Sequence, residues 1–520
     1  MKLKQILHDV SYTLLLGNED IFIDDICYDS RNVVKNCVFV CVKGKHEDGH
    51  RHIMEVIEKG AKAIIIDTVS SVSLEKIVEL QKKVSVVLVE NSQKALAYIS
   101  ATFFDYPATK CTVIGITGTK GKTTTSYMIK SILEAWGAVV GLIGTNGAFV
   151  KDEKISLSYT TPPSYEIQKL LHDMVRCGCN YIVMEVSSIG LKMNRVEGIP
   201  FDYGIFTNIS EDHIGGEEHK DMEEYLYWKQ SLFSQCNISI GNIDDSFCSY
   251  ILSKSKGERI YYGLHHQCNS NACSNAYSYA CSYAYSTGTN IEYITTTSGL
   301  GSVFTACYKD SIKEEQLPIH LTLAGECNIY NSLAAIACCI HIGCTKEAIQ
   351  KGLSNFFVTG RMEVVESNDT FHLLIDYAHN ANSLEQLLKT LASYHPKRIV
   401  CIFGCGGNRS KTRRYQMGEI SGRFADVSII TEDNSRYEDV TQIINDILVG
   451  IKKTNGVYKV IPNRREAIEY SITHAEQGDV ILLVGKGHED YQEIKGKRTP
   501  FSEHAIVKEI MEKRKLGEIE

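Results

Sequence analysis

The sequence predicts an α/β protein of three domains, and two observations lead to this fold class. Short apolar runs alternate with stretches of helical spacing along most of the 520 residues, a pattern that favours parallel sheets covered by helices. A chain of this length can also form two to four domains with separate hydrophobic cores. We therefore expect a small first domain, a Rossmann-like central domain and a doubly wound C-terminal domain.

The first domain is predicted for residues 1–106. Residues 37–44 and 61–67 are short apolar runs that suit buried strands, and residues 50–61 between them have helical spacing and a glycine stop. The pattern breaks at Tyr106-Pro107, because a residue before proline disfavours the helical conformation. We place the first domain boundary there.

The second domain is predicted for residues 107–344. It opens with an apolar strand at 111–118, and helices and strands then alternate over residues 122–137, 138–144, 164–178 and 181–188. In open sheets of this kind, ligands bind beyond the carboxyl ends of the strands. Three polar segments fall at such ends, namely residues 115–125, 185–188 and 206–213.

Residues 265–290 are predicted to be a flexible, low-complexity surface insertion, because Asn, Ser, Ala, Cys and Tyr dominate them. Their cysteines, Cys268, Cys273 and Cys281, have spacings that fit no standard metal site. The third domain is predicted for residues 345–520. It contains four passages in which an apolar strand runs into a polar loop, at 371–379, 398–407, 426–434 and 479–489. Functional side chains are expected on these loops.

Composition limits the classes of partner. The formal net charge is −8 with a pI near 6.1, so no basic surplus indicates nucleic-acid binding. No apolar run approaches the roughly 18 residues that span a bilayer, and the N-terminus has no signal-peptide pattern. We expect a cytoplasmic monomer with reduced cysteines and with neither a nucleic-acid nor a membrane partner.

The segment "VIGITGTKGKTTTS" (residues 113–126) has the character of a phosphate-binding loop. Gly121-Lys122-Thr123 matches the end of Gly-x4-Gly-Lys-Ser/Thr, but Ile116 stands where the first glycine is expected. Glycines still let backbone N–H groups approach phosphate, and the following helix points its positive end at the anion. Lys122 can bridge the outer phosphates, and the Thr123 hydroxyl can bind Mg²⁺. The alternative is a glycine-rich turn without a ligand.

This spacing resembles the ATP loop of the Mur ligase superfamily, whose members form amide bonds with ATP. The folylpolyglutamate synthases share a similar loop, so the loop alone does not set the substrate. Other motifs match the superfamily in order along nearly the whole chain and fit its MurE-type ligases best. They include "DSR", "YTTP", "MEVSS", "FTNISEDH", "YLYWKQSLF", "LAGECNIYNSLAA", "GRME", "DYAHNANSLE", "EDNSR" and "GKGHEDYQ".

The resemblance implies a P-loop ATPase central domain that requires ATP and Mg²⁺. Its ATP-binding residues would be Gly118, Thr119, Lys120, Gly121, Lys122, Thr123, Thr124, Asn328, Asn331, Arg361 and Asp376. The nucleotide would lie between the second and third domains, so domain closure would assemble the site. The implied metal ligands are Thr123, Glu185, His213 and Lys229, with Lys229 converted by CO₂ to a carbamate. Lys122, Lys229 and His213 would be catalytic. Without the resemblance, Lys229 and His213 would be interpreted as solvated side chains.

The resemblance also implies two organic substrates, a UDP-N-acetylmuramoyl-dipeptide and a diamino acid. "EDNSR" resembles a motif that accompanies meso-diaminopimelate, and its arginine can pair with the distal carboxylate that L-lysine lacks. The implied amino-acid contacts are Arg409, Asn434, Arg436, Gly485 and Glu489. The implied contacts to the UDP substrate are Ser30, Thr160, Thr161, Ser187 and Arg195.

The resemblance therefore implies an ATP-dependent amide ligase of peptidoglycan precursor synthesis, with a role in cell shape and division. Two alternatives stay open. A MurE-like paralogue would join another amino acid, such as L-lysine, to a related acceptor. Departures from the family pattern favour it, at Tyr159, Ile189, Met193 and Ser435. A protein of another class would bind nucleotide without catalysis, as a scaffold with residues 265–290 for docking.

Overall fold

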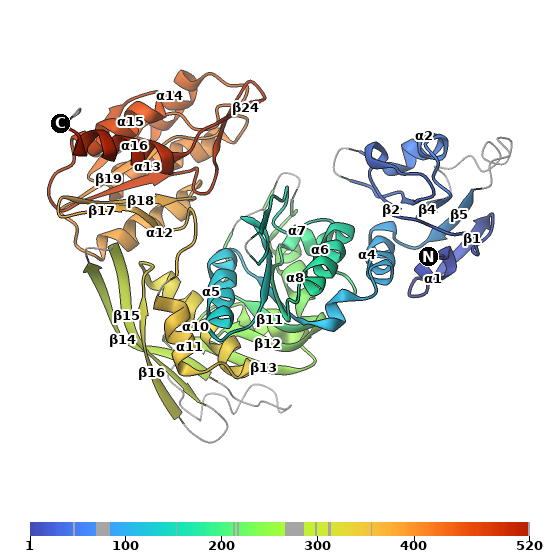
Figure 1. The fold of residues 1–520 in the computed structure, drawn as a ribbon. Coiled ribbons are helices and arrows are strands. Elements are labelled where there is room, and N and C mark those ends of the chain that lie inside the picture. Colours follow the sequence, from blue (N-terminus) through green and yellow to red (C-terminus); the bar gives the residue numbers. More distant parts are fainter. Residues whose placement is uncertain are drawn as a thin grey trace. The chain divides into compact units, whose positions relative to one another are not determined.

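The structure is a computed structural model, and it describes residues 1–44, 47–68, 84–151, 153–211, 214–215, 218–265, 285–296, 299–309, 314–354 and 356–517. Figure 1 draws the helices and strands along the chain. The described chain divides into two compact units. The first unit comprises residues 1–285 and 334–343, and the second comprises residues 286–333 and 344–520. No helix within the described ranges is long and apolar enough to cross a membrane.

The N-terminal part of the first unit is a five-stranded sheet in the order β1-β5-β4-β3-β2. Its strands are β1 (Tyr12–Leu16), β2 (Ile26–Cys27), β3 (Val38–Val40), β4 (Ala63–Ile66) and β5 (Ser85–Val89). Four of them are parallel and β1 is antiparallel. Helices α1 (Leu3–Ile6) and α4 (Ser92–Phe103) bury apolar side chains against one face, and α2 (Ile53–Glu58) packs on the other. The central strands β3 and β4 are apolar and buried on both faces because both faces of the sheet are covered.

The central part of the first unit is built on parallel strands in the order β13-β12-β11-β6-β10-β7. These are β6 (Thr112–Thr117), β7 (Val140–Gly144), β10 (Tyr181–Glu185), β11 (Phe201–Phe206), β12 (Cys236–Asn242) and β13 (Glu258–Gly263). Beyond β7, the strands β8 (Gly147–Val150) and β9 (Glu153–Ile155) continue antiparallel. Parallel pairing brings the carboxyl ends of β6, β7, β10 and β11 to one edge of the sheet, where ligands bind in such folds.

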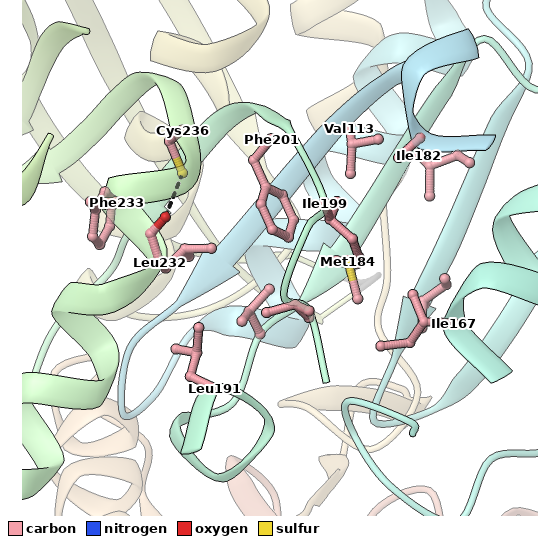
Figure 2. Packing of buried hydrophobic residues seen from close by; sticks show 14 of the residues in the cluster. Val113, Ile167, Ile182, Met184, Leu191, Ile199, Phe201, Leu232, Phe233 and Cys236 are labelled. Atoms are coloured by element: carbon pink, nitrogen blue, oxygen red, sulfur yellow. Dashed lines mark hydrogen bonds between the residues drawn. The ribbon is translucent and has the colours of Figure 1, made fainter. Parts of the chain in front are cut away.

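Helices cover this central sheet and hold that edge in place. Side chains from α6 (Ser164–Arg176), α7 (Ser188–Lys192), α8 (Met222–Ser231) and α9 (Cys248–Ile251) share one hydrophobic cluster with the strands. Figure 2 shows Val113, Ile182, Met184 and Phe201 from the strand region packed with Ile167 and Leu191. Helix α5 (Lys122–Ala135) contacts β6, β7 and β10 and buries Met128, Ile129 and Ile132. Burial at this density fixes the strand ends firmly.

The second unit contains strands β14 (Tyr285–Thr296), β15 (Gly299–Lys309) and β16 (Glu314–Leu321), and helix α11 (Lys346–Ser354). Helix α10 (Glu326–Ile342) belongs to the second unit up to residue 333 and to the first unit beyond it. A six-stranded sheet follows in the order β17-β18-β22-β19-β20-β21. Its strands are β17 (Glu363–Ser367), β18 (Phe371–Asp376), β19 (Arg398–Phe403), β20 (Val427–Ile430), β21 (Val457–Val460) and β22 (Asp479–Val484). All are parallel except β17. A separate hairpin joins β23 (Tyr491–Ile494) and β24 (Lys497–Pro500).

The six-stranded sheet is doubly wound, as predicted. Helices α12 (Ala381–Ala392), α13 (Lys411–Phe424) and α14 (Val440–Ile451) bury side chains against one face. Helices α15 (Arg464–Thr473) and α16 (Glu503–Lys515) bury side chains against the other. The loops after β18, β20 and β22 therefore leave the same edge of the sheet.

The predicted fold class is confirmed, and each apolar run that was assigned to a strand above contains one. The described cysteines, including Cys177 and Cys179 at the turn between α6 and β10, are free thiols. The boundaries at residues 106 and 344 stay predictions. Most of the predicted insertion at 265–290, with Cys268, Cys273 and Cys281, lies outside the described residues.

Candidate active site

The phosphate loop connects β6 to α5 and depends on two glycines with positive φ. Gly118 has a φ of +150°, and a Cβ there would lie 1.9 Å from Thr207 Oγ1. Gly121 has a φ of +87° and occupies the N-cap of α5, where it has no side chain to cap the helix. The first N–H groups of α5 therefore face outward at the positive end of the helix dipole, which suits an anion.

Two lysines that are distant in the sequence meet at one backbone oxygen of this loop. Lys122 Nζ donates to the Gly118 carbonyl at 2.8 Å and to the Thr119 carbonyl at 3.1 Å. Lys229 Nζ, from α8, donates to the same Gly118 carbonyl at 2.8 Å. Lys229 is only 1% exposed, and its ammonium lies 4.5 Å from the centre of the Tyr225 ring. The structure thus concentrates positive charge where the loop would receive phosphates.

Glu185 ends β10 beside the loop and gathers hydroxyl groups around its buried carboxylate. Thr123 Oγ1 donates to Glu185 Oε2 at 2.9 Å, and Thr145 donates to the same carboxylate through its N–H and its hydroxyl. At Gly144 a Cβ would come within 2.2 Å of Glu185 Oε1, so only glycine leaves room for this carboxylate. A carboxylate and a hydroxyl are the oxygen donors that Mg²⁺ prefers, so Thr123 and Glu185 fit a magnesium site.

His213 lies outside the described residues, so its predicted role as a metal ligand stays a prediction. The nearby His219 is described and is buried. Its Nε2 lies 2.9 Å from Ser188 Oγ, and its ring packs 5.2 Å from the Tyr225 ring. Burial, followed by the charge of Lys192, lowers the pKa of His219. A neutral imidazole is therefore favoured at this position.

The residues predicted to contact the UDP substrate form a connected set next to Glu185. The Thr161 hydroxyl donates to the Glu185 carbonyl at 2.9 Å, and the Ser187 N–H donates to Thr161 Oγ1 at 2.9 Å. Arg195 Nη1 donates to the Thr161 carbonyl at 2.7 Å, and its guanidinium lies 4.5 Å from the Tyr159 ring centre. Burial lowers the pKa of Arg195.

Thr160 and Ser30 are placed differently. The Thr160 and Thr145 hydroxyls lie 3.1 Å apart, which links Thr160 to Glu185 through Thr145. Ser30 belongs to the N-terminal sheet region, where its carbonyl accepts from Lys59 Nζ at 2.7 Å. Thr145 and Tyr225 were missed by the sequence reasoning. Thr145 directly follows β7, so the strand-end rule contained the signal for it. Tyr225 is the first residue of the motif "YLYWKQSLF", but no chemical pattern in the sequence singled out its side chain.

The second unit contains the remaining residues predicted for the nucleotide. Asn331 Nδ2 donates to Asn328 Oδ1 at 3.1 Å, and both side chains are buried on α10. Asp376, at the end of β18, accepts from the N–H groups of Met362 at 2.8 Å and Ala378 at 2.7 Å. The Arg361 guanidinium lies 5.0 Å from the Tyr377 ring centre. Arg361 and Asp376 are therefore neighbours, and Asn328 and Asn331 form a hydrogen-bonded pair.

Four of the five predicted amino-acid contacts lie on two loops, residues 433–436 after β20 and residues 485–489 after β22, which we call the amino-acid loops. The fifth, Arg409, lies between β19 and α13. Asn434 Nδ2 donates to Glu489 Oε2 at 2.8 Å and joins the two loops. Arg436 has a φ of +51°, and its Nη1 donates to the Gly407 carbonyl at 2.7 Å. Gly485 also has positive φ, and a Cβ there would lie 3.2 Å from Asp433 Oδ2.

Arg409 and Arg436 both lie close to Gly406. A Cβ at Gly406 would lie 3.0 Å from Arg436 Nη1 and 3.9 Å from Arg409 Cγ. Burial, followed by the charge of Asp433, raises the pKa of Glu489. Four of the five predicted residues thus form one partly buried cluster with a cation and a carboxylate, while the Arg409 side chain is exposed beside it. Such a cluster suits an amino acid with a charged carboxylate and ammonium group.

Comparison with known proteins gives three matching family descriptions. They are the Mur ligase middle domain over residues 116–339, the Mur ligase glutamate ligase domain over 360–487 and the Mur ligase family catalytic domain over 23–104. A solved structure described as a UDP-N-acetylmuramoyl-L-alanyl-D-glutamate–2,6-diaminopimelate ligase has a TM-score of 0.68 at 24% identity and covers 99% of both chains. A MurF ligase from Thermotoga maritima in complex with ADP has a TM-score of 0.58 at 18% identity, over 95% of this chain and 98% of that one.

Curated relatives match at higher identity. A UDP-N-acetylmuramoyl-L-alanyl-D-glutamate–2,6-diaminopimelate ligase from Clostridium acetobutylicum is 40% identical over 98% of this chain and 99% of its own length. A ligase of the same name from Caldanaerobacter subterraneus is 38% identical, again over 98% and 99%. The similarity therefore extends over the phosphate loop and the amino-acid loops alike.

Proposed function

From the premise that this chain belongs to the Mur ligase family, we propose that it is an ATP-dependent acid–amino-acid ligase of peptidoglycan precursor synthesis. It joins meso-diaminopimelate to UDP-N-acetylmuramoyl-L-alanyl-D-glutamate. The observation that carries this proposal is the end-to-end similarity, at 40% identity, to a relative that bears the name of this reaction. The charged cluster of the amino-acid loops supports it, because a second carboxylate distinguishes diaminopimelate from lysine and suits Arg436.

The reaction proceeds through an acyl phosphate. A carboxylate oxygen of the terminal D-glutamyl group attacks the γ-phosphorus of ATP, and ADP leaves. The amine of diaminopimelate then attacks the acyl carbon and loses a proton, and phosphate leaves as the amide forms. Lys122 and the N-terminus of α5 stabilise the negative charge that accumulates on the phosphoryl group in the first step.

Other residues of the first unit orient the substrates. The Thr161–Ser187–Arg195 set, adjoining Glu185, would hold the acceptor next to the phosphate loop. Thr123 Oγ1 and the Glu185 carboxylate would hold Mg²⁺, which supplies positive charge next to the triphosphate. His213 is proposed as a further ligand on the strength of the family pattern alone.

Lys229 is proposed to act as a carbamate. Its uncharged amine would attack CO₂, and one proton would be released as the N–C bond forms. This converts a buried cation into an anion with two oxygen ligands, at the edge of the sheet where Glu185 already lies. The buried position of Lys229 against the Gly118 carbonyl supports the proposal, because an ordinary lysine is rarely buried without a specific role.

A panel assay tests the proposed function. UDP-N-acetylmuramoyl-L-alanyl-D-glutamate is offered with ATP, Mg²⁺ and one of meso-diaminopimelate, L-lysine or L-ornithine, and phosphate release and peptide product are measured. We expect product with diaminopimelate at a kcat/KM at least about 100-fold above that for L-lysine, since a lost charge-assisted pair costs about 3 kcal/mol. Preference for L-lysine would support the paralogue alternative. Nucleotide binding without phosphate release in any mixture would support the scaffold alternative.

A further inference from the structure

The geometry points to Lys486 as a positioning residue of the amino-acid loops, where its ammonium fixes the orientation of the Asn434 amide and offsets the charge of Asp433. The inference rests on the proposed function, because it concerns how the same cluster binds its diamino acid. Lys486 lies between Gly485 and Gly487 after β22 and was not among the residues predicted from the sequence.

Lys486 is a fully buried cation with a specific set of partners. Its side chain is 0% exposed, and its Nζ donates to the Asn434 Oδ1 at 3.1 Å and to the Tyr491 carbonyl at 2.8 Å. Asp433 Oδ1 lies 3.4 Å away. An ammonium has three donors, so these three oxygens match its capacity. Burying a charge costs free energy unless it is paired and hydrogen-bonded, and this site meets both conditions.

This bonding pattern fixes which end of the Asn434 amide faces Glu489. Asn434 Oδ1 accepts from Lys486 Nζ at 3.1 Å and from the Glu493 N–H at 2.9 Å. With two donors on the oxygen, the NH₂ group has to point the other way, where it donates to Glu489 Oε2 at 2.8 Å. A flipped amide would direct its NH₂ group at an ammonium. Lys486 therefore positions Glu489 through Asn434.

The charge of Lys486 matters separately from its hydrogen bonds. Asp433 and Glu489 are two carboxylates on facing loops, and the charge of Asp433 adds to burial in raising the pKa of Glu489. Lys486 and Arg436 oppose that effect. By pairing with Asp433, Lys486 helps to keep Glu489 ionised, and an ionised Glu489 can bind the ammonium at the distal end of the diamino acid.

The test is steady-state kinetics of Lys486→Met, with each substrate varied in turn. We expect the KM for diaminopimelate to rise about tenfold, as for a lost charge-assisted contact, while the KM values for ATP and the UDP substrate stay within about twofold. We also expect the acid limb of kcat/KM for diaminopimelate to move to higher pH, because loss of the cation raises the pKa of Glu489 further. A merely structural role would move neither quantity in the folded fraction.

Controls separate this role from stability. Lys497→Met removes an exposed lysine from β24 and should change nothing. Ile472→Ala opens a cavity in the hydrophobic core between the six-stranded sheet and helices α15 and α16. It should therefore lower Tm and leave the KM for diaminopimelate unchanged. In a double-mutant cycle, Lys486→Met should have less than about a twofold further effect once Glu489→Gln is present.

An unchanged KM for diaminopimelate in folded Lys486→Met overturns the inference, even when the wild-type protein makes the product. If Lys486→Met does not fold, the same measurements on Lys486→Leu decide, because leucine has neither a donor for Asn434 nor a charge. Wild-type values for that variant would equally overturn it. Absence of any product with the wild-type protein is a different result, which overturns the proposed function and this inference with it.

Discussion

The phosphate loop and the amino-acid loops hold their functional groups by different means. The phosphate loop relies on backbone, with two glycines at positive φ, an uncapped helix N-terminus and one carbonyl that binds two lysines. The amino-acid loops rely on side chains, which form a series of polar contacts from Asp433 through Lys486 and Asn434 to Glu489. Triphosphate offers many equivalent oxygens to backbone N–H groups, whereas an amino acid has to be recognised by charge and direction.

The largest effect on activity is expected from a substitution in the phosphate loop. Lys122→Met removes one of the two cations that donate to the Gly118 carbonyl and should lower kcat by about 1,000-fold, because charge stabilisation carries most of phosphoryl transfer. The measurement is ADP formation at saturating substrates. If Lys122→Met instead changed the KM for diaminopimelate and left kcat unchanged, the division of roles between the phosphate loop and the amino-acid loops would be wrong.

A smaller loss is expected from Lys229→Ala, which should lower kcat by about 100-fold. Because the proposed carbamate is an oxygen ligand, short carboxylic acids such as acetate should restore part of the activity. The same acids should do nothing for Lys122→Met, which serves as the matched control. Full activity of Lys229→Ala without any added acid would count against the carbamate.

The amino-acid loops should respond through KM. Arg436→Lys keeps a positive charge but loses the planar fork, and we expect the KM for diaminopimelate to rise about 30-fold with kcat little changed. The KM for ATP, measured in the same variant, provides the internal control. An equal rise in both KM values would show that the phosphate loop and the amino-acid loops do not bind their substrates independently.

The smallest effect concerns the support of α8, which carries Lys229. Glu224 pairs with Lys192 at 2.9 Å, and this contact lowers the pKa of Glu224 to about 2. Its stabilisation is therefore present above the unfolded-state pKa and is lost as the pH falls towards 2. Glu224→Gln should lower the free energy of unfolding by about 1 kcal/mol at pH 7, and the difference should shrink below pH 4. Urea unfolding at several pH values measures it, and a gap independent of pH would contradict the assignment.

The same contrast explains what the sequence could predict. The phosphate loop is contiguous, so Gly118, Lys122 and Thr123 could be assigned from one short segment and its strand–loop–helix context. Glu185 could be found because it ends an apolar strand. Thr145 also follows a strand, but a single threonine there has no distinctive pattern. Lys486 could not be singled out, because its burial depends on Asp433, Asn434 and Tyr491, which meet it only after the sheet forms.

The shared Gly118 carbonyl has a spectroscopic consequence. Its oxygen has two lone pairs, and the ammonium groups of Lys122 and Lys229 both bind to it. If either ammonium turns towards a phosphate, or Lys229 loses its positive charge, this oxygen loses a strong donor and its C=O bond stiffens. When the Gly118 carbonyl carries ¹³C, its infrared band is separated from those of the other carbonyls. This band would then move to higher frequency when ATP binds or when Lys229 becomes a carbamate. A single backbone atom would thus report the state of the whole phosphate site.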